Sequence, residues 1–396
     1  MKLSSRARQV VGSPTLALDA KTKELIAQGV NVISFAVGEP DFDTPDHIKT
    51  AAIDSIKKGF TKYTPSTGIL ELRQAVCAKL KADNGLDYQP AEVLVSVGAK
   101  HSIYNAVMAL CDDGDEVLIP APYWVSYPEM VKLAGGKPVI VNATIDTGFK
   151  VTPEQVEKAI TPKTSVIIFN SPSNPTGAVY TEEEMRGIAE VCLKHGVAII
   201  SDEIYEKLIY EGKHVSVAAL SPEIKANTVT VNGVSKSYAM TGWRIGYAAG
   251  PKEVISAMGR IQGHATSNPT SISQVAAVAG LKGPQEELEK MRVEFQKRRD
   301  YMVARLNEMP GFKCLTPPGA FYTYPDVSAL IGRKVAGKLV KDDDALADIL
   351  LEDARIAAVP GSGFGSKGNI RFSYATSMKL IEEGMNRLAK VLTTLE

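Results

Sequence analysis

The chain has 396 residues, of which 44% are hydrophobic, a length that favours a large domain with a sizeable core and a smaller domain beside it. Lysine plus arginine (45) equals aspartate plus glutamate (45), so no net field favours nucleic acid or an anionic membrane as a partner, and a small-molecule substrate is expected. Gly12 and Pro14 interrupt the N-terminal apolar residues, so neither a signal sequence nor a membrane span is expected there.

The cysteines and histidines carry little signal of their own. The four cysteines lie far apart and form no C-x-x-C pair, which suits a soluble protein in a reducing cytoplasm. None of the five histidines lies at metal-ligand spacing from another, so we predict no metal site.

Short apolar runs alternate with helical patterns from residue 93 onward. The runs cover residues 93–97, 116–119, 138–141, 165–169, 197–201, 228–231 and 245–249, and helices are predicted at 101–110, 182–194 and 285–309. Most of the runs are continuously apolar, as expected of strands that helices cover on both faces. We therefore predict an α/β fold, with a mostly parallel central sheet flanked by helices in the large domain.

The C-terminal part is predicted to form a smaller α+β domain. Its expected strands are residues 312–315, 320–324, 356–359 and 370–374, and its expected helices are 343–353 and 378–393. The N-terminal segment has no sheet of its own and is expected to pack on this domain. The predicted division is 1–45 for that segment, 46–295 for the large domain and 296–396 for the small one.

Lys236 follows the apolar run at 228–231 and is surrounded by small residues that let a bulky ligand approach. A lysine removed from water has a lowered pKa and can form a Schiff base with a carbonyl. Arg244, eight residues later, offers a planar fork suited to a phosphate. An amine with a phosphate anchor suggests pyridoxal 5'-phosphate (PLP) as cofactor, although either residue alone would more often be an ordinary surface residue.

Polar residues follow two other predicted strands, at the edge where ligands bind to open parallel sheets. Asp202 and Tyr205 come after the run at 197–201. The carboxylate could hold a protonated pyridine nitrogen and the hydroxyl could bond the ring oxygen, or Asp202 could simply cap a helix. Asn174 lies in the turn-rich segment 170–177, where we expect a cis Asn174–Pro175 bond and a side chain that points at the ring; a plain turn is the alternative.

The segment Gly98-Ala99-Lys100 leads from a predicted strand into a predicted helix. Free backbone N–H groups at a helix N-terminus bind anions, so this turn is a candidate phosphate cup. A cation at Lys100 opposes the helix dipole unless an anion lies nearby. Trp124 follows the run at 116–119 and could stack on a planar ring or pack in the core.

Taken together, these segments resemble the class I aminotransferases of fold type I, in the aspartate aminotransferase branch that includes the aspartate/prephenate enzymes. The lysine signature of that family fits residues 233–246 position by position. Residues 36–42, 63–64, 121–128, 174–177, 201–205 and 370–374 match further family segments in the same order, so the resemblance covers the whole chain.

The resemblance implies a PLP-dependent transaminase that exchanges amino groups between aspartate or glutamate and 2-oxo acids, in a homodimer with shared active sites. Lys236 would carry the cofactor and move the proton, and Arg371 would clamp the substrate α-carboxylate with help from Gly38 and Asn174. The implied cofactor residues are Lys236, Asp202, Tyr205, Asn174, Trp124, Gly98, Ala99, Lys100 and Arg244, with Tyr63 reaching the neighbouring subunit.

Two departures from the family pattern bear on the ligands. Gly233 stands where many relatives have a serine that donates to the phosphate, so only backbone is expected to contact it there. Gly263 stands where better-known relatives present an arginine to the distal carboxylate, and we expect Lys100 to replace it. Thr15 matches a position associated with prephenate use, which would yield arogenate.

Two other enzyme functions remain open from the sequence, and a third, non-enzymatic function is disfavoured. The same fold and cofactor serve aromatic or kynurenine-type aminotransferases and PLP β-lyases. A PLP-dependent transcription regulator would need an added DNA-binding module, for which the N-terminal residues leave no room.

Overall fold

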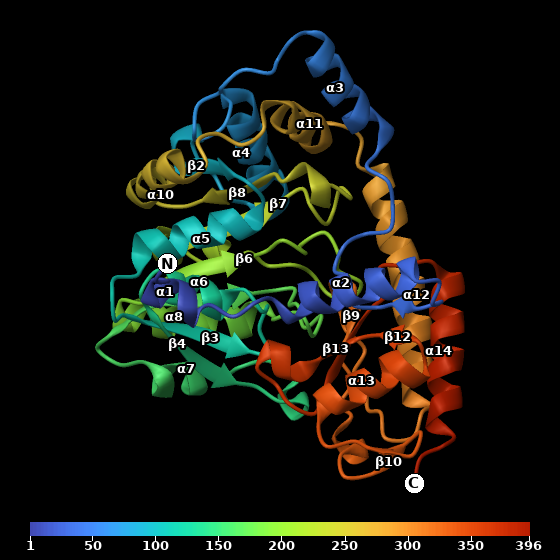
Figure 1. Ribbon diagram of the computed structural model, residues 1–396. Helices are drawn as coiled ribbons and strands as arrows, with labels where there is room; N and C mark the ends of the chain where they lie inside the picture. The colour runs from blue at the N-terminus through green and yellow to red at the C-terminus, as the bar shows by residue number, and fades with distance from the viewer.

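A computed structural model describes residues 1–396 and is organised around a seven-stranded sheet. The strand order is β2-β8-β7-β6-β5-β3-β4, and all neighbours are parallel except β8, which runs antiparallel to both β2 and β7 (Figure 1). The prediction of a mostly parallel α/β sheet is confirmed. The strands are β2 (Val93–Ser96), β3 (Glu116–Ala121), β4 (Lys137–Asn142), β5 (Thr164–Asn170), β6 (Ala198–Asp202), β7 (Thr228–Gly233) and β8 (Gly246–Ala249).

Helices bury both faces of this sheet, which explains why its strands are continuously apolar. Helices α5 (Ala99–Leu110) and α6 (Tyr127–Leu133) lie on one face, and α7 (Pro153–Ala159), α8 (Glu182–His195) and α9 (Pro222–Ala226) pack on the other. The helices α3 (Asp46–Lys57), α4 (Leu70–Asn84), α10 (Lys252–Ala265) and α11 (Ser271–Lys282) gather near β2 and β8. We call this sheet and its helices the large lobe.

The C-terminal part forms a small lobe around the antiparallel sheet β13-β14-β9. Its elements are β9 (Tyr322–Thr323), the hairpin of β10 (Lys334–Val335) and β11 (Lys338–Leu339), α13 (Asp343–Asp353), β12 (Ile356–Ala357), β13 (Val359–Pro360), β14 (Ile370–Ser373) and α14 (Met378–Leu392). Helix α12 (Glu286–Asn307) runs unbroken between the lobes, in orange at the right of Figure 1. The expected boundary at 295/296 therefore falls inside a continuous helix.

The N-terminal residues contact both lobes. Strand β1 (Ile33–Ser34) pairs in parallel with β12, and α2 (Pro14–Ala27) contacts β12 and β13. Helix α1 (Ser5–Gln9) instead contacts α6, and the backbone N–H of Val11 donates to Oε2 of Glu129 at 2.9 Å. The segment between α1 and α2 thus crosses from one lobe to the other.

One expected strand is wrong and another is divided. Residues 312–315 form no strand, and only Lys313 makes an isolated bridge with Asp326. The side-chain amide of Asn307 bonds both the N–H and the C=O of Cys314, so this backbone is satisfied without a neighbouring strand. The run at 356–359 breaks into β12 and β13, which pair with different partners. No helix of the chain is both long and apolar enough to cross a bilayer.

Candidate active site

A cavity of about 300 Å³ opens between the two lobes, beyond the carboxyl ends of β5 and β6. Its size suits a small ligand. The cavity brings together residues that lie far apart in the chain. The predicted site residues that line it are Thr15, Gly38, Ala99, Lys100, Trp124, Asn174, Asp202, Tyr205, Lys236, Arg244 and Arg371.

Two predicted residues lie elsewhere. Gly98 caps α5 just behind the cavity wall, where a Cβ would collide with the Arg244 guanidinium. Tyr63 lies on the loop between α3 and α4 with 90% of its surface exposed, and it does not line the cavity of its own chain. Gly263 lies on α10 near Ser66 and is also remote from this cavity.

Lys236 projects into the cavity from the segment that follows β7. Its Nζ donates to the carbonyl oxygen of Gly38 at 2.5 Å. Removal from bulk water lowers the pKa of Lys236 to about 8; the nearby charge of Glu39 opposes this shift and that of Arg371 adds to it. An amine with this pKa is partly neutral near physiological pH, which a nucleophile toward carbonyls requires.

Asp202, the last residue of β6, is buried and lies below the cavity floor. Its Oδ2 accepts a hydrogen bond from the Tyr127 hydroxyl at 2.7 Å, and its Oδ1 accepts from the N–H of Ile204 at 3.2 Å. Burial raises the pKa of Asp202 to about 6, and these two hydrogen bonds limit the rise. A carboxylate in this setting gains from a buried cationic partner such as a protonated ring nitrogen.

Arg371 on β14 reaches across to the large lobe. Its Nη1 donates to Oδ1 of Asn174 at 2.9 Å and its Nη2 donates to the carbonyl of Ala36 at 2.6 Å, while Nε has no partner. Asn174 is held in turn, because its N–H donates to Oδ1 of Asn170 at 2.9 Å. The Asn174–Pro175 bond is cis, as expected. Burial lowers the pKa of the Arg371 guanidinium, so a buried carboxylate ligand would be favourable here.

The N-terminus of α5 forms a second cationic corner. Gly98 has φ +81° and lets the chain turn into the helix at Ala99. Arg244 donates to the carbonyls of Thr241 at 2.9 Å and Val97 at 3.4 Å, so its charge has no carboxylate partner. The helix N-terminus and this guanidinium together suit a phosphate.

Ser235 also lines the cavity, one residue before the candidate nucleophile. The expectation that only backbone would be available near Gly233 is therefore incomplete, because Ser235 adds a hydroxyl. At Gly233 itself a Cβ would lie about 3.0 Å from the Gly246 backbone, so this site has little space for a side chain.

Lys100 lies at the cavity wall with its Nζ 4.8 Å from the centre of the Trp124 ring. Burial and then the charge of Arg244 lower the pKa of Lys100. Trp124 packs edge to face on Tyr127, with ring centres 5.4 Å apart. Thr15 enters from α2, and its hydroxyl lies 2.8 Å from that of Ser13.

The cavity thus fits a phosphorylated pyridine cofactor and an anionic substrate. Lys100, Lys236, Arg244 and Arg371 all line it, and none of the four forms a salt bridge with a carboxylate of the chain. Arg371 is buried and Lys236 is half-buried, and unpaired cations in such positions are unfavourable unless anions join them. Two carboxylates line the cavity, Asp19 and Asp202, and of these only Asp202 is buried.

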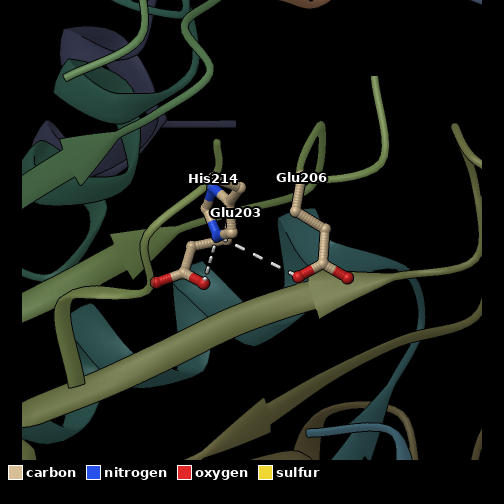
Figure 2. A group of neighbouring side chains, drawn as sticks. All are labelled: Glu203, Glu206 and His214. Carbon is tan, nitrogen blue, oxygen red and sulfur yellow. Dashed lines mark hydrogen bonds and ion pairs between the residues drawn. The ribbon is translucent and has the colours of Figure 1, made fainter. Parts of the chain in front are cut away.

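A buried charge cluster lies just behind the site. Glu203 follows Asp202 and points to the opposite face of the sheet, since successive side chains of a strand alternate. The Nε2 of His214 lies 3.0 Å from Glu203 Oε2 and 4.0 Å from Glu206 Oε2 (Figure 2). Lys79 of α4 pairs with Glu206, and the Ser216 hydroxyl donates to Glu203 at 2.9 Å.

These residue types could hold a metal ion, but the cluster contains its own cations. Burial opposes protonation of His214, yet the hydrogen bond and charge of Glu203 and the charge of Glu206 prevail and raise its pKa. Protonated His214 and Lys79 balance the two carboxylates. We therefore describe the cluster as an ion-pair network that ties the loop after β6 to α4.

Sequence reasoning missed several residues of the site. Tyr127 and Tyr322 were not expected there, although both contact predicted residues directly, and Leu16 and Asp19 of α2 also line the cavity. The contacts of Tyr127 with Asp202 and of Tyr322 with Tyr205 are tertiary, and no local pattern in the sequence signals them.

Comparisons with known proteins agree with this geometry. A family model described as aminotransferase class I and II matches residues 30–388. The aspartate aminotransferase of Geobacillus stearothermophilus is 54% identical over 393 residues, which cover 99% of both chains. The aspartate/prephenate aminotransferase of Cereibacter sphaeroides is 52% identical over 389 residues, or 98% of this chain and 97% of that one. The crystal structure of the aspartate aminotransferase from Rhizobium meliloti superposes with a TM-score of 0.97, at 45% identity and 100% coverage of both chains.

Proposed function

Because this chain belongs to the class I and II aminotransferase family, we propose that it is a PLP-dependent transaminase that moves amino groups between aspartate or glutamate and 2-oxo acids. We propose prephenate as a further acceptor, which would yield arogenate. Thr15, which lines the cavity as Lys100 does, supports this, as does the relative from Cereibacter sphaeroides. The observation that carries the proposal is the set of four cationic side chains around one cavity without a carboxylate partner.

PLP, when bound, supplies a carbonyl for the amine and a ring that stores electrons while the substrate proton moves. In this proposal Lys236 would bind the cofactor and would then move the proton that leaves the substrate α-carbon to the cofactor. Asp202 keeps the ring nitrogen protonated, and Tyr205 and Asn174 donate to the ring oxygen. Trp124 stacks on the ring and excludes water from one face.

The anions divide among the cations. The N-terminus of α5, the Ser235 hydroxyl and Arg244 would bind the cofactor phosphate. The guanidinium of Arg371, whose Nε has no partner, would bind the substrate α-carboxylate. Lys100 would bind the distal carboxylate of aspartate, because this chain has Gly263 where better-known relatives have an arginine for that carboxylate. This assignment gives Arg244, Arg371 and Lys100 one anion each, and leaves Lys236 to bind the cofactor carbonyl.

We further propose a cytoplasmic homodimer whose two cavities are shared. Tyr63 is exposed, and so are several apolar side chains close to it in the sequence; a segment with so many exposed apolar residues is typical of an interface rather than of free surface. Its hydroxyl would then reach the phosphate in the neighbouring subunit. Four free cysteines suit a reducing compartment. The exposed apolar residues near Tyr63 in the sequence are Ile53, Ile56, Phe60 and Leu70.

We also propose that residues 46–295 form the cofactor domain, and residues 1–45 and 296–396 the smaller one.

The test is the substrate dependence of Lys100→Met, which keeps an unbranched stem against Trp124 and removes the charge. Loss of one partner of a close charge pair costs roughly 2 to 5 kcal/mol, and Lys100 keeps some solvent access, so we expect kcat/KM for aspartate to fall by at least about 30-fold. Transamination of phenylalanine should change little.

Lys137→Met, on the surface of β4, serves as the matched control and should affect neither substrate. Equal losses for aspartate and phenylalanine would assign Lys100 to the phosphate or to the fold instead. A wild-type protein that transaminates phenylalanine but not aspartate would favour the aromatic alternative.

A further inference from the structure

Two tyrosines from different lobes join their hydroxyl groups behind the site. Tyr205 follows β6 in the large lobe, and Tyr322 lies on β9 in the small lobe. Their Oη atoms are 2.8 Å apart, and both side chains are buried. No other residue accepts or donates a hydrogen bond at either hydroxyl.

Tyr322 is held in place by its other neighbours. The Arg371 guanidinium lies 4.5 Å from the centre of its ring, a distance at which a cation is attracted to an aromatic face. Its hydroxyl abuts the Cα of Gly38, where a Cβ would collide with it. These two contacts fix the Tyr322 ring between Arg371 and the backbone of Gly38, whose carbonyl accepts from Lys236.

The number of protons fixes the direction of this hydrogen bond once the cofactor is bound. A tyrosine hydroxyl has one proton, so a Tyr205 that donates to the cofactor ring oxygen cannot also donate to Tyr322. Tyr322 must then be the donor and Tyr205 the acceptor. Burial raises the pKa of both phenols, so both keep their protons at neutral pH.

We propose that Tyr322 is a positioning residue that donates to Tyr205, turns the Tyr205 proton toward the cofactor ring oxygen and connects that oxygen with the Arg371 clamp. This inference rests on the proposed function. A donor whose own oxygen accepts a hydrogen bond is polarised and donates more strongly. The effect of Tyr322 should therefore appear at the ring oxygen, through Tyr205.

The readout is the pH at which the absorbance of the bound cofactor changes. A hydrogen bond to the ring oxygen withdraws negative charge from it, so the adjacent Lys236 nitrogen holds its proton less tightly. Tyr322→Phe keeps the ring under Arg371 but removes the donor. It should raise the midpoint of the absorbance titration by on the order of half a pH unit.

Two further variants make the test specific. Tyr324→Phe, a buried tyrosine of the same segment that bonds Ser366 instead, should leave the midpoint unchanged. Tyr205→Phe should raise the midpoint more than Tyr322→Phe does. The double variant Tyr205→Phe/Tyr322→Phe should match Tyr205→Phe alone, because Tyr322 acts only through Tyr205.

An unchanged midpoint in Tyr322→Phe, or an additive shift in the double variant, would overturn the inference while the proposed function stands. A wild-type protein that gains no pH-dependent absorbance with PLP would instead overturn the proposed function, and this inference with it.

Discussion

The surroundings of Lys236 lower the pKa of its amine, which is the change that a nucleophile needs. An amine attacks a carbonyl only in its neutral form, and the folded chain lowers the pKa of this amine to about 8. We expect the rate at which cofactor-free protein captures PLP to rise with pH around a midpoint near 8. Mixing experiments that follow the absorbance of the bound cofactor over a pH series measure this.

A midpoint near that of an ordinary lysine, about 10.4, would mean that the cavity does not activate Lys236. Lys236→Ala provides the control, since any remaining absorbance change reports reaction of other lysines.

Asp202 is the second residue whose role depends on charge. In Asp202→Asn the side chain keeps its shape and can keep one oxygen as acceptor for Tyr127, so the fold should persist. The neutral amide cannot hold a ring cation, and removing one partner of a buried ion pair should lower turnover by about 10²-fold or more. Steady-state assays measure this loss, with exposed Asp146→Asn as the control. Near wild-type turnover would reduce Asp202 to a structural residue.

At the scale of elements, the sequence predicted best those features that depend on a single helix or strand. Strands buried on both faces are mostly apolar, so all seven strands of the central sheet could be found from local patterns, as could residues at their ends such as Asp202. Tyr127 and Tyr322 could not, because their contacts join α6 and β9 to a loop that is distant in the chain. The strand expected at 312–315 was wrong for a similar reason: the amide of Asn307 satisfies its backbone, and a sequence pattern does not show that partner.

The stability that the loop after β6 adds to the fold should depend on pH, because it involves the titration of His214. The folded pKa of His214 is raised above its unfolded value of about 6.5, so its contribution to stability is complete below that pH and is lost as the pH rises through the folded pKa. At pH 6, His214→Gln breaks a buried ion pair and should lower the free energy of unfolding by about 3 kcal/mol. The loss should be smaller at pH 9.

Urea unfolding of both proteins at the two pH values measures this difference. His195→Gln is the matched control, because its contact with Glu157 at 3.3 Å lies at the surface and should contribute little. A loss for His214→Gln that does not change with pH would show that the ring packs there as a neutral group.

At the scale of the whole molecule, each cavity is expected to need two chains. Tyr63→Ala and Lys236→Ala subunits, each inactive as homodimers, should regain activity when they are mixed and refolded together. Half of the dimers are then mixed, and one of their two sites carries neither substitution, so recovery should approach about a quarter of the wild-type activity. Refolding each variant alone is the control. If mixing restores nothing, Tyr63 does not serve the neighbouring subunit.

The division into lobes was only partly visible in the sequence. The further strand and helix patterns that follow the long charged helix indicated a second unit, but helix α12 passes through the expected boundary without a break. The N-terminal segment was expected on one lobe because it lacks a sheet of its own. Its contacts with both α6 and β12 depend on side chains such as Glu129, which no periodicity identifies.

The pairing of β1 with β12 determines when each part of the chain can be completed during synthesis. A ribosome releases every strand of the seven-stranded sheet by residue 249, so the large lobe has all its strands while the C-terminal third is still untranslated. The backbone N–H groups of Ile33 and Phe35 must wait for the carbonyls of Arg355 and Ala357 before they find a partner. Apolar residues near the start of the chain therefore stay uncovered longest in the nascent protein, where a chaperone would have most time to bind them.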